Sequence, residues 1–145
     1  MNKINRVLVL FFVLVGFSNI SYAKENFFQE AKKEFEKKKM DNSKFLFQRN
    51  IVFNPKDAKS YLYLAKIFNF EKNEEEEEKN LNTTLLLEPS NEQAMYMLIE
   101  IELKRSNYSR VKKLRDDFEI ICSDLCNKIQ SINETLQNIE PKKDS

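Results

Sequence analysis

Histidine and tryptophan are both absent from this chain of 145 residues. The lack of histidine excludes serine or cysteine triads that use an imidazole base, metal sites with histidine ligands, and haem attachment. No catalytic, metal or cofactor site of those classes can be built from this sequence. We therefore expect a protein that is not an enzyme and that uses no cofactor.

Glycine and proline are scarce as well. The one glycine is Gly16, and the three prolines are Pro55, Pro89 and Pro141. Sheets and hairpins depend on tight turns that favour glycine, asparagine and proline at set positions. A chain with no glycine after residue 16 has little of that turn chemistry, which predicts an all-helical protein.

The N-terminal segment has the three parts of a secretory signal. Lys3 and Arg6 form a basic start, residues 7–17 are an apolar run, and Ser21 and Ala23 are small residues at the two specificity positions of a cleavage site. The run is shorter than the roughly 20 residues that span a bilayer. We expect a signal peptide over residues 1–23, cleaved after Ala23, and a periplasmic or secreted protein without a membrane span. A retained signal anchor is the alternative.

The charges are nearly balanced, with a formal net charge of +1. Removal of Lys3 and Arg6 would leave 22 basic against 23 acidic residues. Nucleic-acid binding needs a concentrated basic surface, so we expect no nucleic-acid partner. The last six residues, 140–145, are mostly charged and are predicted to be a disordered tail.

Pro55 and Pro89 lie 34 residues apart, and the residues around them match at the same offset. The matched pairs are Phe27 with Tyr61, Ala31 with Ala65, Phe47 with Leu81, Ile51 with Leu85, and Asp57 with Asn91. Apolar residues at steps of three and four predict helices over about 26–38, 43–53, 58–70, 74–87, 91–105, 108–121 and 125–137. A fixed period with two such segments per unit indicates a helical repeat protein.

Short polar residues mark the expected starts of three of these helices. Asp41-Asn42-Ser43 would supply the turn and N-cap of the second helix, and Asn73 the cap of the fourth. Ser90 with Gln93 three residues later resembles a capping box at the start of the fifth.

The middle unit, residues 58–91, resembles a tetratricopeptide repeat through Tyr61, Leu64-Ala65, Phe68, Leu81 and Pro89. The resemblance implies an all-α, right-handed α-solenoid of three such helix–turn–helix units, over about 24–57, 58–91 and 92–124. A C-terminal capping helix over about 125–138 completes a domain of residues 24–139. The outer units depart from the pattern, with Glu30 in place of a large apolar residue and Glu102 at the position that matches Phe68.

The concave surface of a tetratricopeptide array is built by the first helix of each unit. Steps of 34 align three rows there, which are Phe28, Leu62 and Tyr96, then Gln29, Tyr63 and Met97, and lastly Lys32, Lys66 and Glu100. An aromatic and methionine strip edged by lysines suits an apolar peptide or helix that carries some negative charge. Ordinary packing between helices is the alternative reading of the same residues. The carboxylate clamp known in the family is broken, because its first-helix positions hold Phe28 and Lys32.

Cys122 and Cys126 are the only cysteines. In an exported protein two thiols that bracket a short turn are expected to form a disulfide. A redox site is the alternative, although a redox pair is usually spaced by two residues rather than three.

Five consecutive acids, Glu74 to Glu78, could bind a cation, but they also fit the first turn of a helix, which favours negative charge. Adjacent helical residues point in different directions, so the helix-start interpretation is preferred and no metal site is expected.

These features together predict an exported, non-catalytic binding module that holds a peptide or protein segment in a concave groove. Envelope or periplasmic complex assembly is the setting that the resemblance permits. Two alternatives stay open, which are a periplasmic thiol redox protein that uses Cys122 and Cys126, and a structural subunit of a larger assembly.

The signal peptide yields the first testable prediction. We expect the exported protein to begin at Lys24, because the residues before it fit a signal-peptidase site. N-terminal sequencing of the protein from the soluble fraction of the producing cells checks this. Recovery of a membrane-bound form that retains Met1 would contradict it.

Overall fold

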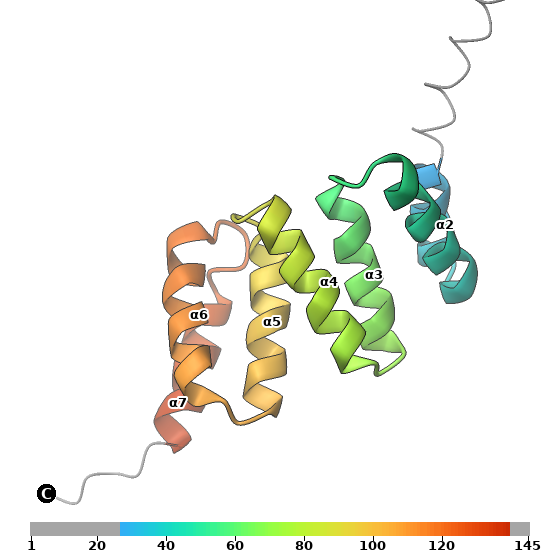
Figure 1. The fold of residues 1–145 in the computed structure, drawn as a ribbon. Helices are drawn as coiled ribbons and strands as arrows, with labels where there is room; N and C mark the ends of the chain where they lie inside the picture. Colours follow the sequence, from blue (N-terminus) through green and yellow to red (C-terminus); the bar gives the residue numbers. More distant parts are fainter. Residues whose placement is uncertain (1–26, 140–145) are drawn as a thin grey trace, which may run out of the picture. The chain divides into compact units, whose positions relative to one another are not determined.

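The computed structural model of the chain describes residues 27–139. Its helices are a segment over residues 27–36, α2 Met40–Phe53, α3 Ala58–Phe70, α4 Glu74–Leu87, α5 Glu92–Lys104, α6 Tyr108–Ile121 and α7 Lys128–Ile139 (Figure 1). No strand occurs in this part of the chain. The expected signal peptide and charged tail lie outside the described residues. The all-α class expected from the sparse turn residues is confirmed.

The chain divides into two compact units, and the boundary lies between Leu64 and Ala65, within α3. The first contains the helix over residues 27–36, α2 and the start of α3. The second contains the rest of α3 and helices α4 to α7. Within residues 27–139, every helix falls short of the length and apolar content that a membrane crossing requires.

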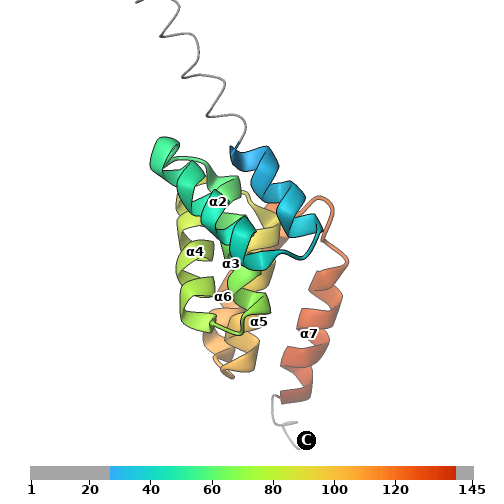
Figure 2. The ribbon, with the colours of Figure 1, turned by 90° about the vertical axis from the view of Figure 1, so that its right-hand side faces the viewer.

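The helix over residues 27–36 and α2 form a hairpin in the first unit (Figure 2). Ala31 and Phe47 are fully buried, and so is Ser43. The Ser43 hydroxyl donates a 2.9 Å hydrogen bond to the carbonyl oxygen of Ala31. A small residue facing a small residue lets the two helices approach closely, and the hydrogen bond satisfies the buried hydroxyl.

Ser43 was expected to help start α2, and this expectation is wrong. The helix begins at Met40, so Asp41, Asn42 and Ser43 lie in its first turn, and the N-cap residue Lys39 makes no side-chain cap. The turn that the polar residues were expected to form is made earlier, at Lys38 and Lys39, by the backbone alone.

The same backbone turn closes the first helix of every repeat. Lys38, Lys72 and Ser106 are the only non-glycine residues with positive φ in the described chain, at 59°, 59° and 57°, and they are spaced by 34. At each place two backbone hydrogen bonds run back into the helix, for example from Lys72 to Asn69 at 3.1 Å and from Asn73 to Phe68 at 2.9 Å. This is the Schellman arrangement of a helix C-terminus. The period read from the sequence is therefore also a period of the backbone.

Buried polar side chains connect α2 to α3 across the proline turn. Asn50 is 2 % exposed, and its amide donates to Asp57 at 2.8 Å and to Ser60 at 2.9 Å. The Ser60 hydroxyl in turn donates to the Asp57 carboxylate at 2.7 Å. The three side chains satisfy one another, so the turn after Pro55 is fixed without glycine.

Helix α4 agrees with the sequence expectation and α5 differs slightly. The Asn73 side chain accepts from the Glu76 N–H at 3.2 Å and caps α4 as expected. Helix α5 is capped by Asn91, whose side chain accepts from the Ala94 N–H at 2.9 Å. The capping box expected at Ser90 and Gln93 is therefore wrong, because Asn91 stands one residue closer to the first helical turn.

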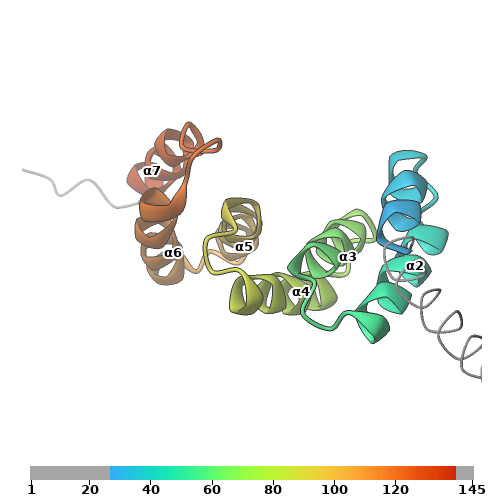
Figure 3. The ribbon, with the colours of Figure 1, turned by 90° about the horizontal axis from the view of Figure 1, so that it is seen from above.

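The second unit packs around one apolar cluster drawn from α5, α6 and α7. Its buried members are Met95, Ile99, Val111, Phe118, Ile132 and Leu136. Helix α4 lies against α5, α5 against α6, and α6 against α7 (Figure 3). Helix α7 starts at Lys128 rather than near Leu125, but it covers this cluster as the expected capping helix.

The left-handed turns lead to a prediction about stability. Lys72 holds a positive φ that a side chain with a Cβ disfavours. Replacing it with glycine (Lys72→Gly) should therefore stabilise the protein by about 0.5 kcal/mol, after the larger chain entropy of glycine in the unfolded state is subtracted. Lys79→Gly, inside α4, is the matched control and should instead cost about 1 kcal/mol. Urea unfolding of the two variants measures both, and a loss of stability in Lys72→Gly would contradict the turn assignment.

Candidate binding surfaces

Four aromatic rings meet in the first unit. Tyr63 stacks on Phe47 with ring centroids 4.9 Å apart. Its edges contact Phe28 at 5.9 Å and Phe35 at 5.2 Å. Phe47 is fully buried, whereas Phe28, Phe35 and Tyr63 are half-buried. Each half-buried ring thus has one side in the core and part of its surface open.

Leu62 and Lys32 behave differently from these rings. Leu62 is 7 % exposed, so it is a core residue, and the expectation of an exposed side chain in the groove is wrong for this position. Lys32 lies near Glu36, with 3.9 Å between its ammonium nitrogen and the carboxylate. Both side chains are largely open to solvent, so this pair contributes little to stability and leaves the ammonium group accessible.

A second half-buried surface is formed by α5 in the second unit. The ring of Tyr96 lies 6.1 Å from Phe118, and the Lys128 ammonium lies over it at 5.5 Å from the centroid. Burial, and then the neighbouring Glu100 carboxylate, raise the pKa of the Tyr96 phenol. Met97, one residue further, is also half-buried, and Glu100 is exposed. Tyr96 thus packs partly against the core, which the alignment of residues at steps of 34 did not predict.

Lys66 completes the predicted set and is half-buried in the second unit. The structure brings Phe28 together with Tyr63, and Tyr96 together with Glu100. It moves Leu62 into the core. The role of Phe28, Lys32, Tyr63, Lys66, Tyr96, Met97 and Glu100 in binding stays a prediction.

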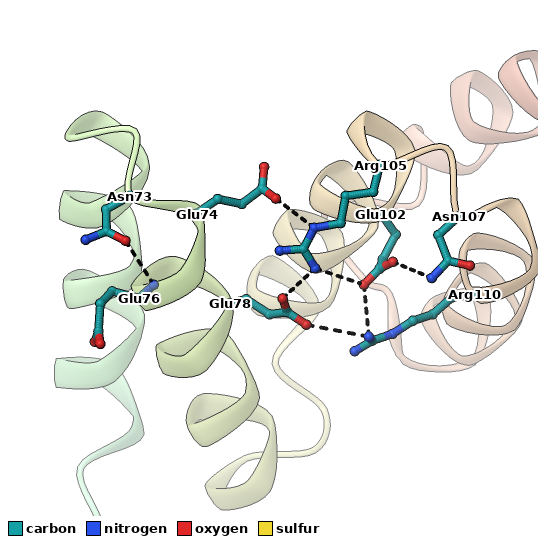
Figure 4. Close-up of polar contacts among 8 residues, drawn as sticks. All are labelled: Asn73, Glu74, Glu76, Glu78, Glu102, Arg105, Asn107 and Arg110. Carbon is teal, nitrogen blue, oxygen red and sulfur yellow. Dashed lines mark hydrogen bonds and ion pairs between the residues drawn. The ribbon is translucent and has the colours of Figure 1, made fainter.

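An ionic cluster joins α4, α5 and α6 (Figure 4). The Arg105 guanidinium donates to Glu74 at 2.7 Å and to Glu78 at 2.6 Å. Arg110 lies 3.5 Å from Glu78 and 3.0 Å from Glu102. Hydrogen bonds from the side chain of Arg105 to Glu78, then Glu74, raise its pKa further above its already high ordinary value. The cluster therefore ties the start of α4 to the end of α5 and the start of α6.

Glu102 is the buried member of this cluster, at 1 % exposure. Its Oε2 accepts from the Asn107 amide at 2.8 Å. Its Oε1 has no well-aligned hydrogen bond, although Arg110 Nη1 lies 3.0 Å away, so that contact is an ion pair. The repeat pattern places an aromatic residue here, and the two arginines explain how a carboxylate is held instead.

Four of the five acids at the start of α4 have partners within the second unit, with Glu74 and Glu78 bound by Arg105. Glu76 pairs with Lys79 at 3.0 Å, and Glu77 accepts from the Asn69 amide at 2.9 Å. Burial raises the pKa of Glu77, which is 3 % exposed. No group of three or more acidic or cysteine side chains in residues 27–139 is arranged to hold a metal ion.

The loop between α6 and α7 binds the Glu92 carboxylate through its backbone N–H groups. Cys122 and Cys126 form the expected disulfide, with their Cα atoms 5.3 Å apart. Between them, the N–H groups of Ser123, Asp124 and Leu125 all donate to Glu92, at the start of α5, at 2.8 to 3.2 Å. These hydrogen bonds, that from Ser123 first, lower the pKa of Glu92. No sequence motif signals this contact, because backbone donors carry no residue signature.

Comparisons with known proteins find similarity in fold but none in sequence families. No protein-family model matches the sequence, and no curated protein matches it. Solved structures do match. The TPR2B domain of yeast Sti1, in a complex with pHsp70, is 16% identical with a TM-score of 0.70, covering 79% of this chain and 96% of that chain. The fold is that of tetratricopeptide domains.

Two further tetratricopeptide structures support this assignment. The type III secretion chaperone SycD of Yersinia enterocolitica, in complex with a peptide of the translocator YopD, is 12% identical with a TM-score of 0.69, covering 83% of this chain and 94% of that chain. The Sgt2 TPR domain of Aspergillus fumigatus is 12% identical with a TM-score of 0.68, covering 85% and 87%. The resemblance noted in the middle repeat is thus confirmed as a likeness of fold.

The ionic cluster gives a prediction that uses a double variant. Arg110→Leu removes the nearest cation from the buried Glu102, and we expect it to cost about 1–3 kcal/mol of unfolding free energy. Adding Glu102→Leu should restore most of that loss, because a buried ion pair can often be replaced by apolar side chains. Lys113→Leu, an exposed residue of the same helix, should change stability by no more than about 0.5 kcal/mol. Chemical unfolding measures all three, and a double variant as unstable as Arg110→Leu would refute the pairing.

Proposed function

We propose that this protein is an exported, non-catalytic module that binds a peptide or a protein segment on its half-buried aromatic surfaces. The solved structures of similar fold include proteins caught with such ligands, namely pHsp70 on yeast Sti1, a YopD peptide on SycD and the HSP90 peptide SRMEEVD on RPAP3. Their ligands differ from one another, so the fold supports peptide binding as a class of function and no particular partner.

The observation that carries the proposal is the partial burial of Phe28, Tyr63, Tyr96 and Met97. The three rings are each packed against another ring of the same unit and are still partly exposed. A ring already fixed by its neighbours loses little conformational freedom when a partner covers it, and aromatic and methionine side chains dominate binding energy in interfaces. These residues are therefore suited to bind an apolar segment.

Charge distinguishes the two units and gives the partner a chemistry. Residues 27–64 carry nine basic and five acidic side chains, and residues 65–139 carry ten basic and fifteen acidic ones. Lys32 edges the aromatic surface of the first unit and Glu100 that of the second. The first surface is expected to favour apolar segments with acidic residues, and the second those with basic residues. The broken clamp positions speak against recognition of a C-terminal carboxylate in the manner known from the family.

The location of the protein is part of the same proposal. The signal-like residues 1–23 and the disulfide are both consistent with an oxidising compartment outside the cytoplasm. Work in the assembly of an envelope or periplasmic complex fits a binding module there.

The test of binding starts from peptides selected on the protein itself. Twelve-residue peptides displayed on phage are selected against the disulfide-bonded protein, and the affinity of one synthetic peptide is measured by calorimetry. Met97→Ala should weaken binding about tenfold, because a covering apolar contact is lost. Lys32→Glu or Glu100→Lys should weaken it in the same range, depending on which unit the peptide contacts.

Matched controls make the outcome decisive. Lys33→Glu and Glu75→Lys change the same charges at exposed positions outside the predicted rows, and they should leave the affinity unchanged within about twofold. Circular dichroism confirms that each variant stays folded. Controls that weaken binding as much as the site variants, or a folded protein that selects no peptide, would refute the proposed surfaces. The double change of Tyr63 and Tyr96 to alanine is unsuitable here, because both rings also pack on the core.

A further inference from the structure

The disulfide loop lies at the junction of three helices of the second unit. Cys122 is the C-cap residue that follows α6, and its N–H donates to the Phe118 carbonyl at 2.9 Å. On the other side, the carbonyls of Leu125 and Cys126 accept from Lys128 and Ile129 at 2.9 and 3.1 Å. The loop therefore forms the first turn that leads into α7. Glu92 fastens its middle to α5.

Three backbone N–H groups that converge on one carboxylate require a defined loop conformation. Such a concave arrangement of successive N–H groups binds anions. The disulfide closes the five residues from Cys122 to Cys126 into a small ring and so restricts the conformations that Ser123, Asp124 and Leu125 can adopt. The covalent bond and the carboxylate contact are thus expected to support each other.

Helix α7 depends on this attachment. It has 12 residues, a length at which an isolated helix is marginal in water. Its buried side chains are Ile132 and Leu136, and Ile129 is half-buried. It packs on a cluster that includes the buried side chains of Met95, Ile99 and Phe118.

The disulfide itself is open to reagents. Cys126 is exposed and Cys122 is half-buried, so an external thiolate can approach the bond from solvent. The chain has no other cysteine, so a reductant acts on this pair alone.

We propose that the Cys122–Cys126 disulfide is a redox latch for α7, and that its reduction by an external dithiol releases the capping helix from α5 and α6. In this reaction the S–S bond takes up two electrons and two protons and becomes two thiols, while the external dithiol becomes a disulfide. The freed loop no longer holds its N–H groups on Glu92, and α7 loses its fixed start. The latch is independent of the proposed peptide-binding surfaces and does not require them.

Glu92 provides a readout that is specific to the loop. Its folded-state pKa is lowered by the backbone N–H groups, so its stabilising contribution is present above the ordinary carboxyl pKa and is lost as pH falls through the lowered value. In the proposed release, reduction frees the loop and moves these N–H groups away from Glu92. The Glu92 pKa, followed by carboxyl NMR chemical shifts, should rise toward its ordinary value in the reduced protein.

Limited trypsin digestion tests the release of α7. Lys128 is the only lysine or arginine between Arg115 and Lys142, so cleavage after it reports on the start of α7 alone. Cleavage there should be about ten- to thirtyfold faster after reduction, from the loop-closure entropy that the disulfide removes. The Cys122→Ser/Cys126→Ser variant without reductant should match the reduced protein. Glu92→Gln with the disulfide intact should show a smaller increase.

Two results would overturn the latch. One is cleavage after Lys128 at the same rate, within twofold, in oxidised and reduced protein, together with unchanged hydrogen exchange of the α7 amides. The other is an equal acceleration of cleavage at Lys104 and Arg105, which would mean that reduction destabilises the whole second unit rather than releasing α7.

Discussion

The left-handed backbone turn at Lys38, Lys72 and Ser106 is the constraint on which the repeat depends. At each place the chain leaves one helix and enters the next within three residues, so the angle between the two helices is set by the turn and not by a flexible loop. That angle decides which side chains meet. It brings Ser43 to the carbonyl of Ala31 in the first unit and Glu77 to the amide of Asn69 in the second. Glycine normally supplies such a turn, and here lysine and serine hold it because the paired helices gain more from packing than the strained residue loses.

Buried polar side chains accompany the apolar core of the described residues. The buried set includes Ser43, Asn50, Ser60, Glu77 and Glu102. Each is bonded to a neighbouring helix, to a turn or to a nearby charge, so burial does not leave it uncompensated. The consequence is specificity of geometry, since a hydrogen bond or ion pair at a helix junction tolerates less displacement than an apolar contact. A chain of mean hydropathy −0.59 can form packed hairpins for this reason.

The sequence predicted those features that repeat or that act locally. The period of 34, the bounds of α3 and α4, the Asn73 cap and the pairing of Cys122 with Cys126 follow from spacing and from short-range chemistry. The start of α2 did not, because polar residues at 41–43 resemble a cap while the backbone turn at Lys38 leaves no side-chain signal. The contact of Glu92 with Ser123 spans 31 positions and uses backbone donors, so no residue pattern records it. Helix α7 begins at Lys128 and not near Leu125. Apolar spacing assigned Leu125 to this helix, but the residue lies in the disulfide loop.

Sequence periodicity does not predict how far a side chain on the apolar side of a helix is exposed. That exposure decides whether the side chain can contact a partner. The same spacing that aligned Leu62 with Phe28 and Tyr96 could not distinguish a core residue from an open one, because both lie on the apolar side of a helix. The structure separates them by their neighbours. Leu62 is enclosed, whereas Tyr63 and Tyr96 rest on Phe47 and Phe118 with part of each ring uncovered. Each of the two units thus presents its own aromatic side chain, fixed by packing in the free protein, and a side chain fixed in this way loses little conformational entropy when it is covered. The charged residues of the predicted rows differ in sign between the units, with Lys32 in the first and Glu100 in the second.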